Sequence, residues 1–130
     1  MQLQSLTNVS LWLLTYLAGH KGVVPASELN KALGFSKQSF IVPVAKLKEK
    51  GYVSAVSGPF GGYSLCKRPE EISVLDILTL FDDELRLDND KVPRASCCKA
   101  VDNLKGLLHK MDDDFEQTMS TYTLADLLKE

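Results

Sequence analysis

The residues that most often bind metals or undergo redox reactions are few in this 130-residue chain: three cysteines and two histidines. Cys97 and Cys98 are adjacent, and neighbouring residues are poorly placed to bind one metal ion together. His109 lies about three helical turns further along a predicted helix, too far to join them. The sequence therefore predicts no metal site. Two hypotheses for the cysteine pair stay open: inert thiols, or a redox switch near a helix N-terminus, where Lys99 would also favour a thiolate.

Other chemistry has little support in the sequence. No Ser-His-Asp or Cys-His arrangement, phosphate-binding loop or pair of carboxylates placed for acid–base catalysis is visible. The remaining cysteine, Cys66, falls in a short apolar run and is expected to be a packed thiol. We expect the protein not to be an enzyme and to need no cofactor.

Charge is distributed unevenly along the chain. Residues 1–69 carry eight Lys and Arg against two Asp and Glu, a net charge of +6, and residues 70–130 carry seven against fifteen, a net charge of −8. Together they give the overall charge of −2. Such a split predicts that the first half faces a polyanion and that the second half has another task.

The compartment follows from the cysteines and from the apolar segments. Three cysteines do not form the disulfide framework of a small secreted domain. The apolar run of residues 11–18 is much shorter than the roughly 20 residues of a membrane span, and the first ten residues lack the Lys and Arg of a signal peptide. We expect a cytoplasmic protein with no membrane partner.

The first half has the pattern of a winged helix-turn-helix. A helix is predicted over about residues 3–20, apolar on nearly every side and so buried by core or by a partner subunit. Pro25 to Leu33 and Ser36 to Lys50 follow as two helices around Gly34, the order of a helix-turn-helix. Pro43 inside the second helix predicts a kink or a later start. The segments 52–56 and 63–66 then form a two-stranded ribbon, the wing.

The second half is predicted to be helical around one acidic loop. A short helix is expected from Ser73, capped with Asp76 three residues on, and a capping box is expected at Thr123 and Asp126. A long helix over about 97–119 carries an apolar stripe at steps of three and four residues, formed by Val101, Leu104, Leu108, Met111, Phe115 and Met119. The acids at 112–114 and 116 fall mostly off this stripe and predict a solvated face. The fold class is mainly α with a small β-ribbon.

The wing is specific enough to indicate a family. GPFGGYSLCKRPEEISVLDIL, with KLKEKGYVSAV before it and YTLADL near the C-terminus, resembles the Rrf-type family of bacterial winged-helix transcription regulators, which includes the iron–sulfur cluster regulator, the nitric-oxide-sensing repressor and the cysteine-metabolism regulator. The resemblance covers nearly the whole chain. It implies a homodimer, joined through the stripe of the long helix, that binds a palindromic operator.

The resemblance also implies a division of the chain. Residues 1–81 would be the winged helix-turn-helix DNA-binding domain, 82–96 an acidic loop, and 97–130 the dimerisation helix and C-terminal helix. Some relatives bind an iron–sulfur cluster through three spaced cysteines before the long helix. This chain departs from that pattern, with Asp102 at the position of the last such cysteine. A family-type cluster is therefore not expected.

DNA contacts are predicted on both parts of the first domain. The second helix of a helix-turn-helix meets base edges with its N-terminal residues, where Lys can bond guanine and Gln adenine; Lys46 is expected at a phosphate. In the wing, glycines let the backbone approach DNA closely, while Ser57 replaces an Arg common in the family. The predicted DNA-binding residues are Ser36, Lys37, Gln38, Ser39, Lys46, Ser57, Gly61, Gly62, Lys67 and Arg68.

These observations predict a sequence-specific DNA-binding transcription regulator, expected to be a homodimeric repressor without an iron–sulfur cluster. Two alternatives keep the fold. One is a module with weak DNA binding, controlled by an effector or a protein partner. The other is a thiol-based redox-sensing regulator that uses Cys97 and Cys98.

Overall fold

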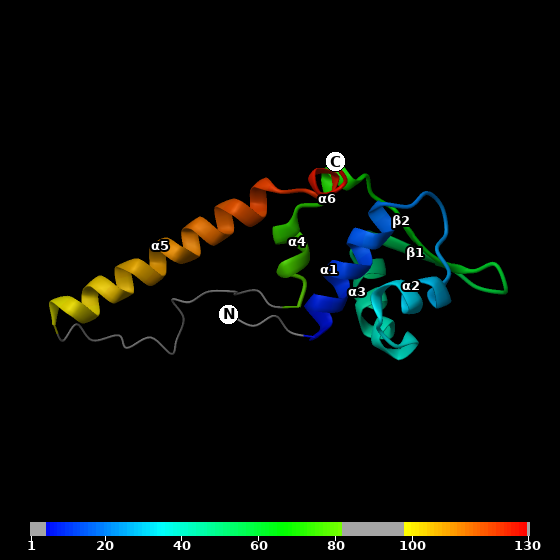
Figure 1. Ribbon diagram of the computed structural model, residues 1–130, viewed down its shortest axis with the longest axis horizontal. Helices are drawn as coiled ribbons and strands as arrows, with labels where there is room; N and C mark the ends of the chain where they lie inside the picture. Colours follow the sequence, from blue (N-terminus) through cyan, green and yellow to red (C-terminus); the bar gives the residue numbers. More distant parts are fainter. Residues whose placement is uncertain (1–4, 82–97, 130) are drawn as a thin grey trace.

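The computed structural model describes residues 5–81 and 98–129. Along the chain, the elements are α1 (Ser5–Ala18), α2 (Ala26–Leu33), the 3₁₀ turn η1 (Lys37–Phe40), α3 (Ile41–Glu49), β1 (Val53–Val56), β2 (Gly62–Leu65), the 3₁₀ turn η2 (Pro69–Glu71), α4 (Val74–Leu78), α5 (Lys99–Thr121) and α6 (Leu124–Leu127). The predicted fold class is confirmed: helices predominate, and the two strands form one antiparallel ribbon (Figure 1).

Helix α1 is the centre of the core. Leu13, Leu14 and Leu17 are fully buried on it, and α1 packs against α2, α3, α4, α6 and β2. Burial of such side chains stabilises a fold by about 1.5–3 kcal/mol each. Trp12 on the opposite side is half exposed, so the chain's own elements cover only part of this apolar helix.

The end of the first helix and the start of the second are marked by the residues that the sequence predicts. Gly34 closes α2 with a φ of 77°, and its N–H donates to the Asn30 carbonyl at 2.9 Å; the Asn30 side chain also donates to the Phe35 carbonyl. The Ser36 hydroxyl accepts from the Ser39 N–H. Because a 3₁₀ turn precedes α3, Pro43 falls in its first turn, where a missing N–H costs no helical hydrogen bond. The α-helix therefore begins later than the predicted Ser36.

The ribbon pairs Val53 with Leu65 at its base and Val56 with Gly62 at its tip. Its second strand is also bonded on the other edge. Val24, just before α2, donates to the Tyr63 carbonyl at 2.8 Å and accepts from the Tyr63 N–H at 2.9 Å. The wing is therefore tied to the helix-turn-helix through backbone atoms.

The C-terminal segment returns to the same core. The Leu124 N–H donates to the Ile72 carbonyl, the Val74 N–H donates to the Tyr122 carbonyl, and the Leu124 side chain is fully buried. Both predicted capping boxes are confirmed, at Ser73 with Asp76 and at Thr123 with Asp126. The Thr123 N–H and the Lys129 ammonium hold the pKa of Asp126 below its ordinary value.

Helix α5 extends away from the core, packed at one end against α4 (Figure 1). Its apolar stripe is open at two of its six positions: Leu104 and Met111 are 55% and 47% exposed, and Leu107 beside them is also exposed. The other four stripe residues are partly buried. Asp113, Asp114 and Glu116 are exposed as predicted, whereas Asp112 is buried. The prediction of a solvated face is therefore wrong for Asp112.

The acidic loop and the cysteines were also the subject of predictions. The acidic loop 82–96 and Cys97 lie outside the described residues. Cys66 is exposed directly after β2, so the expectation of a packed thiol is wrong, because this residue follows the last paired position of the ribbon. No helix of the described ranges 5–81 and 98–129 has the length and apolarity to cross a bilayer.

Candidate DNA-binding face

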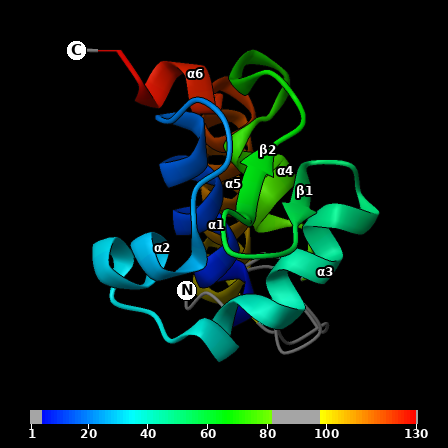
Figure 2. The same ribbon diagram turned by 90° about the vertical axis from the view of Figure 1, so that its right-hand side faces the viewer.

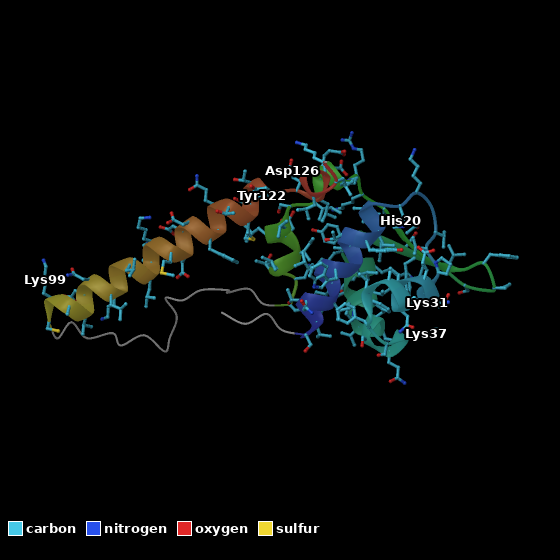
Figure 3. All side chains as sticks on the ribbon, in the orientation of Figure 1. His20, Lys31, Lys37, Lys99, Tyr122 and Asp126 are labelled. Atoms are coloured by element: carbon cyan, nitrogen blue, oxygen red, sulfur yellow. The ribbon has the colours of Figure 1, made fainter. Side chains whose placement is uncertain are left out.

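The predicted DNA-reading elements gather at one end of the molecule. Figure 2 looks onto this end: α2, α3 and the ribbon face the viewer, and α5 runs away behind them. Lys31 and Lys37 lie at this end, and Lys99 lies at the far end of α5 (Figure 3). Two of the eight basic residues of the first half are therefore placed at the helix-turn-helix end of the molecule.

A cleft separates the tip of the wing from the helix-turn-helix. We call residues 57–61 the wing tip. The cleft has a volume of about 360 Å³ and is lined by the start of α2, the side of the wing and Lys37 of η1: Pro25, Ala26, Ser27, Lys37, Val56, Gly58, Pro59, Gly61, Gly62 and Tyr63. Of the predicted DNA-binding residues, the fold thus brings Lys37, Gly61 and Gly62 together.

The start of the recognition segment presents two side chains that are open to a partner. Lys37 and Gln38 are exposed. Ser36 and Ser39 lie beside them, but their hydroxyls are 2.8 Å apart and take part in the cap of η1. Lys46, one turn into α3, is partly buried. The geometry therefore favours Lys37 and Gln38 over the two serines as direct contacts to base edges.

The two wing glycines are required by the protein's own backbone. A Cβ on Gly61 would lie 2.1 Å from the Val56 carbonyl oxygen, and one on Gly62 would lie 2.1 Å from the Val24 carbonyl oxygen. Both positions are too close for any side chain. Contact of Gly61 and Gly62 with DNA stays a prediction, but their presence is explained by the tight turn and by the pairing of β2 with Val24.

The two basic residues after β2 lie at the base of the ribbon, past the Val53–Leu65 pair, and not at its tip. The Lys67 ammonium lies 4.6 Å from the centre of the Tyr52 ring, and Arg68 pairs with Glu71 at 3.4 Å. Each therefore has an internal partner, and the wing-tip residues carry no charge of their own.

Sequence reasoning missed three exposed apolar residues on this face. Ile41 and Val42 of α3 are 63% and 52% exposed, and Phe60 of the wing tip is 92% exposed. Apolar side chains on a recognition helix are of the kind that contact thymine methyl groups. For Phe60, the sequence did contain a signal: an aromatic residue inside a Gly-Pro turn is expected to stay exposed, because a turn buries few side chains.

A polar cluster that the sequence did not reveal fixes α2 against α1. The Tyr16 hydroxyl donates to Glu28 at 2.9 Å, and the His20 ring stacks on the Tyr16 ring with centroids 4.2 Å apart. The hydrogen bond to Glu28 raises the pKa of Tyr16, with burial and the Glu28 charge adding to it. Because Tyr16 lies on α1 and His20 follows it, this surface cluster links α2 to the C-terminal end of α1.

A helix-turn-helix joined to a wing, with basic residues at that end, defines a winged helix-turn-helix DNA-binding protein. A family model described as Rrf2, iron-dependent transcriptional regulator, matches residues 3–130. The chain belongs to the Rrf2 family of bacterial DNA-binding transcription regulators.

Relatives with names and structures agree with this assignment. The chain is 31% identical to an HTH-type transcriptional regulator NsrR of Halalkalibacterium halodurans, over 98% of this chain and 90% of the relative. Its fold is similar to that of the oxidized form of Staphylococcus aureus CymR, with a TM-score of 0.78, 24% identity, and coverage of 100% of this chain and 98% of that one. A transcriptional regulator from Listeria innocua gives a TM-score of 0.80 at 23% identity, over 100% and 88% of the two chains.

The family's description names iron, and the segment before α5, including Cys97, lies outside the described residues. Within residues 5–81 and 98–129, no three His, Cys, Asp or Glu side chains lie together as a metal site. Cys98 is exposed beside Lys99, which marks the far end of α5 (Figure 3), and Cys66 is exposed after the ribbon. These two cysteines thus belong to different ends of the molecule.

The close packing of the wing on α2 gives a test of the fold with a matched control. We expect Gly62→Ala to lower the free energy of unfolding by roughly 1–3 kcal/mol, since its Cβ meets the Val24 backbone. Gly106→Ala, on α5, meets nothing within 4 Å and should raise it by about 1 kcal/mol. Urea denaturation followed by circular dichroism measures both. Equal stability of the Gly62 variant and the parent protein would contradict this packing.

Proposed function

We propose that this protein is a homodimeric transcriptional repressor that recognises a palindromic DNA operator. The observation that carries the proposal is the placement of exposed Lys37 and Gln38 at the start of the recognition segment, beside the cleft under the wing tip. In a helix-turn-helix, this position faces base edges in the major groove. Bound there, the dimer would cover the operator and exclude other proteins from it.

Each part of the face has a role in this proposal. Lys37 would bond guanine and Gln38 adenine, while Ser36 and Ser39 hold the start of η1 in shape. Lys46 would meet a phosphate, as would the wing backbone at Ser57, Gly61 and Gly62. Lys67 and Arg68 lie at the base of the ribbon, so they would contribute charge at longer range.

Dimerisation is supported by the open stripe on α5. A helix of 23 residues that leaves Leu104, Leu107 and Met111 exposed needs a partner for its apolar side. The apolar surface continues past Met119 into a groove of about 400 Å³ lined by Trp12, Val74 and Tyr122, among others. A second copy of the chain lying along α5 and reaching α1 would cover this continuous surface.

We also propose that the protein acts without a family-type iron–sulfur cluster. Such a cluster would need several thiolates in one place. The chain has three cysteines, of which Cys97 and Cys98 are adjacent. The third, Cys66, follows the ribbon, at the other end of the molecule from the start of α5.

The proposed base contacts predict a loss of sequence preference. We expect Lys37→Ala and Gln38→Ala each to reduce the preference for the protein's own upstream DNA over random DNA by about 5- to 150-fold. Lys110→Ala is the control, because this lysine lies on α5 and pairs with Asp114 at 2.7 Å. Fluorescence anisotropy at several salt concentrations gives the measurement. The proposed base contacts would be contradicted if both recognition variants kept the parent preference for upstream DNA, or if the Lys110 variant lost as much of it.

The dimer proposal predicts a change in assembly. Leu104→Glu introduces a charge into the stripe and should convert the dimer into a monomer, as measured by sedimentation equilibrium. Gln117→Glu introduces the same charge on the other side of α5, on an exposed residue, and should leave the dimer intact. A parent protein that sediments as a monomer at all concentrations, or a Leu104 variant that remains dimeric, would rule out this interface.

The cluster proposal predicts a colourless protein. Protein purified without exposure to oxygen should show no visible absorption band and bind its DNA equally well before and after treatment with an iron chelator. A visible band that bleaches with nitric oxide or chelator, with a change in DNA affinity, would refute it.

A further inference from the structure

Phe60 is the most exposed large apolar side chain among the residues that the structure describes, at 92%. By contrast, Phe40 of η1 is fully buried in the core, and Phe35 packs against it. A single exposed apolar side chain is common on protein surfaces. Phe60 is distinguished by its place in the wing tip, whose residues border the cleft shared with Lys37.

The backbone holds Phe60 in a fixed place. Residues 58–61 form a β-turn closed by a hydrogen bond from the Gly61 N–H to the Gly58 carbonyl at 3.0 Å. Pro59 precedes Phe60 and restricts the turn further, and a Cβ on Gly61 would clash with the Val56 carbonyl. The ring is therefore presented by a rigid turn, so little conformational entropy would be lost on binding.

The surroundings of the wing tip indicate a polyanionic partner. The tip itself is uncharged, but its cleft is shared with Lys37 and the start of α2, and residues 1–69 carry a net charge of +6. The backbone pairing of Val24 with Tyr63 fixes the wing beside the helix-turn-helix. When the recognition segment lies in the major groove, the wing tip reaches the neighbouring stretch of the same duplex.

We propose that Phe60 is an apolar wedge that enters the minor groove beside the operator half-site and partly unstacks one base step. Aromatic and aliphatic wedges of this kind bend DNA toward the major groove, and pyrimidine–purine steps unstack most easily. Phe60 thus contributes specificity for a deformable step without a hydrogen bond to any base. The inference rests on the proposed operator binding.

The test compares Phe60→Ala with Phe60→Leu and with Leu128→Ala, which removes an exposed apolar side chain just past α6 that has no proposed DNA contact. DNA from the region that the parent protein protects carries 2-aminopurine at each step flanking a half-site in turn. We expect Phe60→Ala to lose about 5- to 150-fold in affinity, the effect of removing one aromatic–base stack. Phe60→Leu should retain most of the parent affinity, and Leu128→Ala should retain all of it. The salt dependence should not change, because no phosphate contact is removed.

The fluorescence separates insertion from simple contact. Parent protein should raise 2-aminopurine emission at one flanking step, and Phe60→Ala should not. Affinity of Phe60→Ala equal to that of the parent protein, or loss of affinity without any emission change in the parent complex, overturns the wedge while operator binding stands. Failure of the parent protein to bind its upstream DNA overturns both. As a control for folding, Phe60→Ala should unfold at the same temperature as the parent protein.

Discussion

The two backbone hydrogen bonds between Val24 and Tyr63 are the constraint on which the DNA-binding face depends. They join the edge of β2 to the residue before α2, and the absence of a side chain at Gly62 allows the approach. The wing and the helix-turn-helix are therefore joined through backbone atoms, and this pairing places the cleft between them. A face that is already ordered binds DNA without a large entropic cost, and it gives the recognition segment and the wing tip a fixed spacing.

A second backbone junction connects this face to the proposed dimer. The segments around Ile72 and Leu124 are hydrogen bonded to each other, and Leu124 is buried against the core below α1. Helix α5 ends at this junction, so its direction is fixed relative to the wing (Figure 1). If a second copy packs along α5, the same junction sets the distance between the two recognition segments. The packing of the core would then determine the geometry of the dimer, and the dimer would determine the spacing of the operator half-sites.

Local features of the fold could be predicted from the sequence, and non-local ones could not. Helix ends at Gly34, Ser73 and Thr123 depend on residues a few positions apart, and their caps are as expected. The clash that requires Gly62 depends on Val24, which is distant in the chain, so its glycine was assigned to DNA contact alone. Lys67 and Arg68 are predicted DNA-binding residues, and only the ribbon register shows that they lie at the base of the wing and not at its tip. The exposure of Phe60 could not be predicted from the spacing of apolar residues, because Phe60 lies in a turn and not in a helix or strand.

The central claim is that the recognition segments of two copies read one symmetric DNA site. Hydroxyl-radical footprinting on the DNA upstream of the protein's own gene tests it most directly. Two protected half-sites related by two-fold symmetry are expected, with centres about one or two helical turns apart, some 10 or 20 base pairs. Protection of a single half-site, or none at concentrations that already coat random DNA, would contradict it.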